Sequence, residues 1–195
     1  SGKQGYEIAI ALNKLGITTT LIAGPSNLIS PKGLKVKKIT TADEMLDEVK
    51  KSLPVDLVVC AAAVTDFKPV KKNKNKIKKE NINLQSIAFV KNNDILEYIS
   101  KNNKHRPRLV AGFSAETENL TKNSIIKMKR KHCDIIFAND VSQKDIGFNS
   151  DYNEVSVIDK KGNIKIIPKN KKNFIANKIA EILLNKLLID DRNIN

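Results

Sequence analysis

Tryptophan is absent from this chain of 195 residues, and aromatic residues of all kinds make up only 5% of it. There are two cysteines, Cys60 and Cys133, and both lie inside apolar stretches. So few cysteines argue against a disulfide framework and favour a reducing, cytoplasmic location. No apolar run approaches the roughly 20 residues of a membrane helix, and the first residues lack the layout of a signal peptide. We therefore expect no membrane partner.

Arginine is also scarce, with four residues against 31 lysines, although the net charge reaches +14. Proteins that read nucleic acids usually use arginine for base edges and exposed aromatics for stacking. The chain also has 22 asparagines, so its composition is biased toward lysine and asparagine throughout. Such a bias explains the positive charge without a nucleic-acid partner. A basic nucleic-acid-binding α/β module stays as the alternative, and a smaller anion such as a nucleoside triphosphate could use the same charge locally.

Several familiar catalytic and binding patterns are missing. The two histidines, His105 and His132, do not have metal-ligand spacing, and there is no Walker A loop, Ser/His/Asp pattern or paired-cysteine zinc pattern. The opening turn lacks the third glycine of G-x-G-x-x-G, which disfavours a dinucleotide-binding domain of the dehydrogenase type.

What the chain does have is an alternation of strand and helix patterns. The pattern predicts helices over residues 3–15, 41–53, 93–102, 121–131 and 171–189. It predicts strands at 17–23, 36–40, 56–60, 84–90, 109–113 and 134–138, and a hairpin of 155–159 with 164–167. This order indicates one domain over 1–195 with an α/β, three-layer Rossmann-like fold. We expect a mostly parallel sheet, a C-terminal antiparallel hairpin and a lysine-rich flap at about 68–91.

The chain opens on a glycine-containing turn that leads directly into a helix. Such a start is typical of the second half of a strand–loop–helix unit, in which the first strand lies centrally in the sheet. We therefore expect a strand of the natural domain to precede Ser1.

In open α/β sheets, ligands bind beyond the carboxyl ends of the strands. Gly2 and Gly5 flank the start of the first helix, where unpaired N–H groups can hold an anion, although such glycines often mark only a turn. Asp66 follows the predicted strand at 56–60 after a run of small residues. It could bind a substrate group or a cation, or could only cap a turn.

The later loops hold further candidates. In the lysine-rich stretch, Lys76 could reach a triphosphate as a point charge, whereas a solvated loop is the simpler interpretation. Phe113 and Asn139 end two later strands, where a ring could stack on a base and an amide could read its edge. Core packing is the simpler interpretation for Phe113. Lys127 and Lys131 share one helix face and could meet phosphates, or could only be solvated.

These segments together resemble the phosphopantothenate–cysteine ligase family, also called phosphopantothenoylcysteine synthetase, which in many bacteria forms the C-terminal half of a bifunctional coenzyme A biosynthesis protein. The resemblance runs nearly end to end, and its order and spacing are specific although each motif alone is not. The matching segments are Ser1–Gly5, Ala61–Asp66, Lys76–Lys79, Val90–Leu96, Gly112–Thr117, Ala138–Ser142 and Gly147–Asp151.

The resemblance implies a reaction in two halves. The carboxylate of 4′-phosphopantothenate attacks the α-phosphate of CTP, and the amine of L-cysteine then displaces the nucleotide to give 4′-phosphopantothenoylcysteine. It implies Mg²⁺ or Mn²⁺ on the phosphates, a homodimer, and possible fusion to a flavin-dependent decarboxylase half, the only setting in which FMN is expected.

The resemblance also assigns residues. Lys76, Asp66 and Asn139 are expected to be catalytic. The family's nucleotide and substrate contacts fall on these positions and on Gly2, Gly5, Ala62, Asn93, Asp94, Ile95, Leu96, Phe113, Lys127 and Lys131. Asn93 stands where family members often have proline. An asparagine that supports the acyl-intermediate chemistry in the family would fall before Ser1.

Overall fold

A computed structural model describes residues 2–71, 88–102, 104–142 and 150–192. Its helices are α1 (Lys3–Lys14), α2 (Ala42–Ser52), α3 (Ile95–Ser100), α4 (Leu120–Lys131) and α5 (Lys172–Arg192). Its strands are β1 (Thr20–Ala23), β2 (Lys35–Lys38), β3 (Leu57–Cys60), β4 (Phe67–Pro69), β5 (Phe89–Lys91), β6 (Leu109–Glu116), β7 (Ile135–Asp140), β8 (Tyr152–Asp159) and β9 (Ile164–Lys171). The predicted alternation of helices and strands is confirmed in the described residues, except that β4 was not predicted and that most of the predicted strand at 84–90 lies outside those residues.

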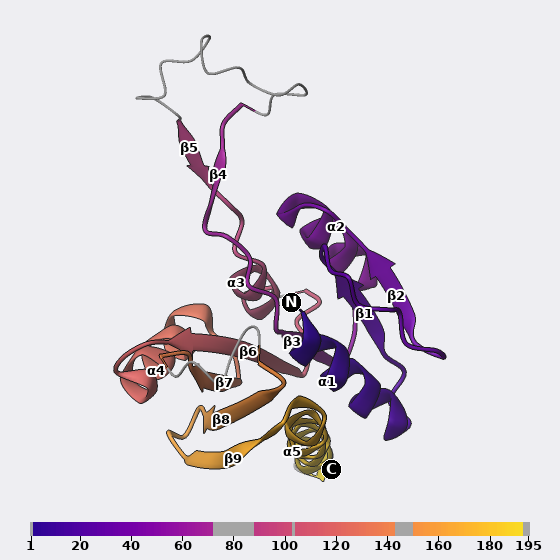
Figure 1. The fold of residues 1–195 in the computed structure, drawn as a ribbon, viewed down its shortest axis with the longest axis vertical. Helices are drawn as coiled ribbons and strands as arrows, with labels where there is room; N and C mark the ends of the chain where they lie inside the picture. The colour runs from indigo at the N-terminus through magenta and orange to yellow at the C-terminus, as the bar shows by residue number, and fades with distance from the viewer. Residues whose placement is uncertain (1, 72–87, 103, 143–149, 193–195) are drawn as a thin grey trace.

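The main sheet has the order β3-β6-β7-β8-β9 (Figure 1). The pairs β3–β6 and β6–β7 are parallel, whereas β7–β8 and β8–β9 are antiparallel. The sheet is therefore mixed, and the prediction of a mostly parallel sheet was wrong on this point. The predicted hairpin is present and extends the main sheet as predicted, but its two strands are longer than predicted and contribute half of the pairings of that sheet.

Helices cover both faces of this sheet and enclose two hydrophobic cores. On one face, α1 and α5 pack against the sheet through residues such as Ile8, Ile179 and Leu183. On the other face, α2, α3 and α4 contribute Leu46, Ile99 and Met128. Side chains that alternate along β6 and β7 serve the two cores in turn, as the pleat of a strand requires.

The local signals that predicted α1 and α2 hold in the structure. Ile8 and Leu12 lie on the buried face of α1, and Gly16 follows the helix with a positive φ of 82°. At α2, the Thr41 hydroxyl accepts from the Glu44 N–H over 3.2 Å. The Glu44 carboxylate accepts from the Thr40 N–H, one residue before the N-cap, so the side chains of Thr41 and Glu44 together form a capping box that closes one residue further out than usual.

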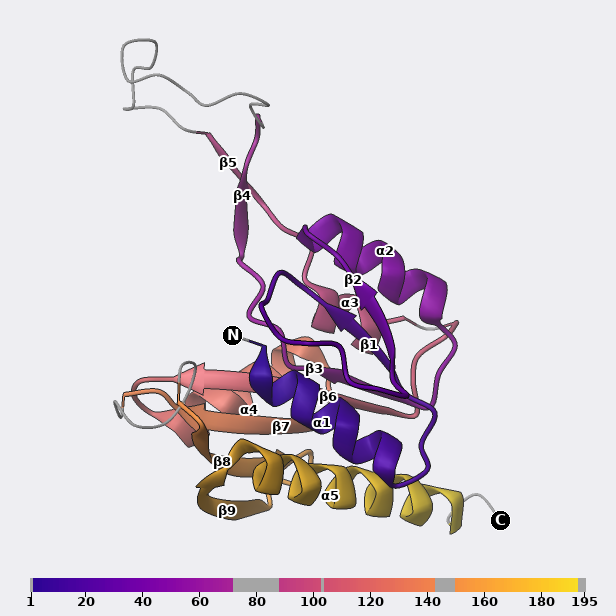
Figure 2. The same ribbon diagram turned by 45° about the vertical axis from the view of Figure 1, so that its right-hand side comes forward.

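Two smaller sheets stand apart from the main one. Strands β1 and β2 form a parallel pair, and in both views β1 is the member nearer to β3 (Figures 1 and 2). Among the described residues, no strand pairing joins β1 to β3. Strands β4 and β5 form an antiparallel ribbon that projects from the body of the molecule (Figure 2). This ribbon is the described base of the predicted flap.

Neither cysteine in the described residues forms a disulfide, as expected. Burial raises the pKa of Cys133 to about 11, so its thiol stays protonated at neutral pH. Among the helices that the structure describes, none is long and apolar enough to span a membrane.

Candidate active site

The candidate residues are placed by the carboxyl ends of β3, β6 and β7, which meet at one edge of the sheet. Cys60 pairs with Gly112, and Ala115 pairs with Asn139. Because these strands are parallel, the loop after β3 and the ends of β6 and β7 lie at the same edge.

Helix α1 begins at this edge. Its N-cap, Gly2, has a left-handed φ of 72°, and no side chain caps the helix. A Cβ placed on Gly5 would lie 3.7 Å from the Cβ of Ala61, so the first turn of α1 packs on the loop that follows β3. The first turn contains no acidic residue. Unpaired N–H groups and the positive end of the helix dipole suit an anion at this point.

Asn139 is tied to α1 through a residue that the sequence reading missed. The Asn153 amide nitrogen donates to the Asn139 Oδ1 and to the Gln4 Oε1, each over 3.3 Å. Asn153 is only 2% exposed, and among the described residues its own amide oxygen has no partner. A signal was present, because Asn153 occupies the inward register of Val155 and Val157 on β8, where an apolar residue is expected.

Positive charge gathers around the same turn. The Lys3 ammonium lies 2.5 Å from a carboxylate oxygen of Asp151, which raises the pKa of Lys3 and lowers that of Asp151. Lys172, at the start of α5, is 4% exposed. Burial lowers the pKa of Lys172, and neighbouring Lys3 lowers it further, against the opposing effect of Asp151. Neither lysine was singled out from the sequence.

The ring of Phe113 is half-buried and faces the core beneath α1 and α5. It packs against Phe137, with ring centroids 5.3 Å apart. The Phe113 carbonyl accepts from the Lys127 ammonium over 2.8 Å, on the opposite side of the strand. Most of the Phe113 ring is therefore packed in the core, as the simpler interpretation of this residue expected.

Ala62 and Asp66 lie on the exposed loop after β3. Asn92 holds that loop in place, because its N–H donates to the Asp66 carbonyl and its amide nitrogen to the Thr65 carbonyl, both over 2.8 Å. Asn92 is 9% exposed, and its amide oxygen has no partner among the described residues. The carboxylate of Asp66 is therefore presented on a loop fixed at its base.

The segment Asn93–Leu96 lies on the α3 and α4 face. Asp94 caps α3 by accepting from the Glu97 N–H over 2.9 Å. A Cβ on Gly112 would come within 2.7 Å of a Leu96 methyl, so the absence of a side chain at Gly112 lets α3 pack closely on β6.

Lys131 is buried beside this segment. Its ammonium lies 2.6 Å from Asp94 and 3.0 Å from Glu97. Burial lowers the pKa of Lys131, but the bonds to both carboxylates outweigh that effect and raise it above its ordinary value. The charge of Lys131 is thus balanced within the protein.

Ala62 and Asp66 lie on the loop after β3, and the other described candidates form two groups, one on each face of the sheet. Gly2, Gly5, Phe113 and Asn139 lie on the α1 side. The residues on the α3 and α4 side are Asn93, Asp94, Ile95, Leu96, Lys127 and Lys131. Lys76, with most of the lysine-rich stretch, lies outside the described residues.

A match to known proteins extends over most of the chain. Residues 1–187 match the model of the DNA/pantothenate metabolism flavoprotein C-terminal domain. The coenzyme A biosynthesis bifunctional protein CoaBC of Borreliella burgdorferi is 40% identical over 185 residues, covering 94% of this chain and 46% of the relative. The Escherichia coli K12 protein of the same name is 37% identical over 194 residues, covering 98% and 45%. The chain thus spans about half the length of these relatives.

Solved structures show the same fold. A crystal structure of the C-terminal domain of CoaBC superposes with a TM-score of 0.78 at 27% identity, covering 98% of this chain and 84% of that one. The DNA/pantothenate metabolism flavoprotein of Streptococcus pneumoniae gives a TM-score of 0.73 at 20% identity, covering 96% and 88%. With the family model matched over residues 1–187, the chain belongs to the DNA/pantothenate metabolism flavoprotein C-terminal domain family.

Proposed function

We propose that this chain is a phosphopantothenate–cysteine ligase domain that works in the cytoplasm on 4′-phosphopantothenate, L-cysteine and CTP. Membership of the family and the names of the CoaBC relatives support this proposal. The structural observation that carries it is the meeting of three features at one sheet edge. These are the uncapped start of α1, the loop bearing Asp66, and the end of β7 with Asn139.

The proposed reaction has two steps. A carboxylate oxygen of 4′-phosphopantothenate bonds to the α-phosphorus of CTP, and the bond from that phosphorus to pyrophosphate breaks. The cysteine nitrogen then bonds to the acyl carbon, the bond from that carbon to the nucleotide oxygen breaks, and CMP leaves as the amine loses a proton. Holding the reactants in line at one edge accounts for much of the acceleration expected of such a site.

The start of α1 is proposed to hold the nucleotide phosphates. The left-handed Gly2 and the N–H groups that follow it suit an anion, and Gly5 keeps the helix close to Ala61. Lys3 and Lys172 add positive charge beside this turn. Lys76 is proposed, from the family resemblance, to stabilise charge that develops on the phosphates during transfer.

Asn139 is proposed to contact the nucleotide base through its amide nitrogen, since its amide oxygen accepts from Asn153. Phe113 contributes the exposed part of its half-buried ring. The Lys127 ammonium donates one of its three N–H groups to the Phe113 carbonyl, so its other two N–H groups can donate to a ligand. On the α3 and α4 face of the sheet, where Lys127 lies, the Asn93–Leu96 segment and Lys131 are proposed to contact the nucleotide.

A divalent cation, Mg²⁺ or Mn²⁺, is proposed to accompany the triphosphate. Within the described residues, no group of three or more His, Cys, Asp or Glu side chains could hold such an ion by itself. That fits Mg²⁺, which keeps several waters and binds through one or two carboxylates together with substrate phosphates. Asp66 is the exposed carboxylate suited to this task, and the ion would neutralise phosphate charge.

We further propose that one more strand completes a Rossmann-like sheet between β1 and β3. A strand that leads into α1 should lie beside β1 by the right-handed rule for such crossovers. The four apolar residues of β3 are only half-buried, whereas Val110 and Ala111 on neighbouring β6 are fully buried. An added strand would cover that edge, and we propose that residues before Ser1 supply it.

The remaining partners follow from the resemblance. We propose that the domain works as a homodimer and that a flavin-dependent decarboxylase half, with FMN, is joined to it in the longer protein. The relatives, which are about twice as long as this chain, support the second point.

Mass spectrometry of the product tests the proposal. The protein, prepared with any residues encoded upstream of Ser1, is incubated with 4′-phosphopantothenate, cysteine, Mg²⁺ and one of CTP, ATP or UTP. We expect 4′-phosphopantothenoylcysteine, fastest with CTP, and none when nucleotide is omitted. Absence of the product with every nucleotide would contradict the proposed function. Duplex binding that collapses steeply with salt would favour the nucleic-acid alternative.

A further inference from the structure

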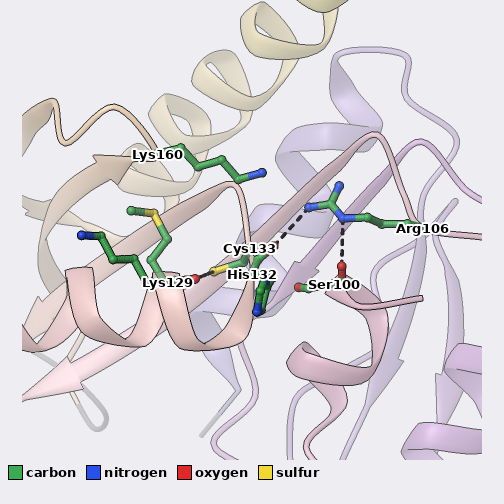
Figure 3. Close-up of a pocket in the computed structure, with 7 residues that line it drawn as sticks. Ser100, Arg106, Lys129, His132, Cys133 and Lys160 are labelled. Carbon is green, nitrogen blue, oxygen red and sulfur yellow. Dashed lines mark hydrogen bonds between the residues drawn. The ribbon is translucent and has the colours of Figure 1, made fainter. Parts of the chain in front are cut away.

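A cavity lies at the amino ends of β6 and β7. It has a volume of about 460 Å³ and is lined by residues where α3 and α4 end and where β8 turns toward β9 (Figure 3). Ser100 closes α3, Lys129 and His132 lie at the end of α4, and Lys160 follows β8. The strands β6 and β7 begin here, whereas Asn139 and the loop that bears Asp66 lie toward the carboxyl ends of the parallel strands.

The charged side chains that line this cavity are all basic: Arg106, Lys129 and Lys160. Arg106 and Lys160 share the carboxylate of Asp134. Lys129 forms no ion pair with any residue that the structure describes. Three cations against one carboxylate leave a surplus of positive charge around the opening.

The C-terminal ends of helices carry partial negative charge, which would oppose an anion. Here the protein itself neutralises that charge at the ends of α3 and α4. The Arg106 guanidinium donates to the Ser100 carbonyl over 2.9 Å and to the His132 carbonyl over 3.2 Å. Arg106 therefore neutralises both helix ends and is held rigidly. Lys129 keeps its charge for a ligand, and Lys160, although paired with Asp134, adds to the surplus of positive charge at the opening.

A buried hydroxyl points into the same cavity. Ser100 is 4% exposed, and in the described part of the chain its Oγ has no hydrogen-bond partner. Figure 3 shows the Ser100 side chain directed toward His132. Buried polar groups are nearly always hydrogen-bonded, so this hydroxyl lacks the acceptor that an anion oxygen would supply.

We infer that this cavity binds a phosphate-bearing anion, with Lys129 and Lys160 as its charge partners and the Ser100 hydroxyl as its buried donor. The volume accommodates an organic phosphate as well as free phosphate. The inference does not depend on the proposed ligase activity.

Backbone amide NMR with two probes, inorganic phosphate and glycerol 3-phosphate, tests the inference. We expect saturable shifts at Ser100, His132 and Cys133 with at least one probe, and the stronger probe identifies the source of the phosphate. Shifts confined to Gly2 and Gly5 would place the anion at the proposed active site and would overturn the inference, as would no shifts at all.

Matched variants sharpen the test. Ser100→Ala should weaken binding about tenfold, because it removes a buried donor to a charged group. Ser124→Ala removes another buried, unpartnered hydroxyl that does not line the cavity and should leave affinity unchanged. Lys129→Gln should weaken binding about threefold, whereas Lys122→Gln, at the far end of α4, should not. Equal effects within either pair would overturn the inference.

Discussion

Asn153 donates a hydrogen bond of 3.3 Å to Asn139, across the antiparallel strands β8 and β7. The same amide group reaches Gln4 on α1. Asn153 thereby fixes the position of Asn139 relative to the helix start that is proposed to hold the phosphates. The geometry of the base contact and that of the phosphate contact are linked through one buried side chain.

Asn139→Ala should reduce the preference for CTP over ATP and UTP, because it removes the amide proposed to read the base. Asn153→Ala should do the same to a lesser degree by releasing Asn139. In the double variant the losses should not add, with a coupling of about 1 kcal/mol. Ratios of kcat/KM for the three nucleotides measure this effect. The exposed Asn177→Ala serves as the control, and strictly additive losses would exclude a positioning role for Asn153.

Lys76→Gln should slow turnover about a hundredfold, because it removes a charge proposed to stabilise the transferring phosphate. Thermal unfolding should change little. As the control, Lys71→Gln removes an exposed lysine that follows β4 in the ribbon, and it should leave turnover near that of the unchanged protein. Pyrophosphate release measures both. Normal release by the Lys76 variant would refute its role.

Lys131→Met should destabilise the fold by about 1–2 kcal/mol, because it leaves two carboxylates near a buried position without their cation. Lys101→Met removes the other, exposed partner of Glu97 and should cost about 0.5 kcal/mol or less. Urea unfolding compares the two. Similar losses would show that burial of Lys131 adds nothing to the strength of its pairs.

Stability should fall in acid partly through Glu97. Hydrogen bonds from Lys101 and Lys131 lower the pKa of Glu97 from 4.5 to about 2. Because the unfolded carboxyl binds its proton at higher pH than the folded one, this contribution is complete above pH 4.5 and is lost as pH falls toward 2. Glu97→Gln should flatten the decline of unfolding free energy in that window. An unchanged pH profile in this variant would contradict the assignment.

The strand and helix pattern could be predicted because local periodicity reflects burial. Residues 109–113 and 135–138 are apolar on both faces, and they form the first parts of β6 and β7 between two helical layers. The polar ends of both strands, Ser114–Glu116 and Asn139–Asp140, were predicted as loops. Pairing with a neighbouring strand extends them, and single-sequence patterns do not carry that information.

The candidate site could be predicted as a set of loops, but not its internal contacts. Asn153 and Asn92 are buried polar residues whose importance depends on the distant partners they hold. The inward register of Asn153 on β8 marks it as buried, but no local motif identifies its partners. The burial of Lys131 beside Asp94 and Glu97 likewise arises from the packing of α3 against α4. The share of antiparallel pairing was underestimated because the hairpin strands are longer than their apolar segments and because β1 and β2 pair apart from the main sheet.

Transfer of an oxygen label tests the central claim most directly. With ¹⁸O in the carboxylate of 4′-phosphopantothenate, attack on the α-phosphorus of CTP and later departure of the nucleotide must carry one labelled oxygen into CMP. We predict ¹⁸O in the released CMP in a one-to-one ratio with the amide product. Amide formation with the label in pyrophosphate or inorganic phosphate, and none in CMP, would contradict the account.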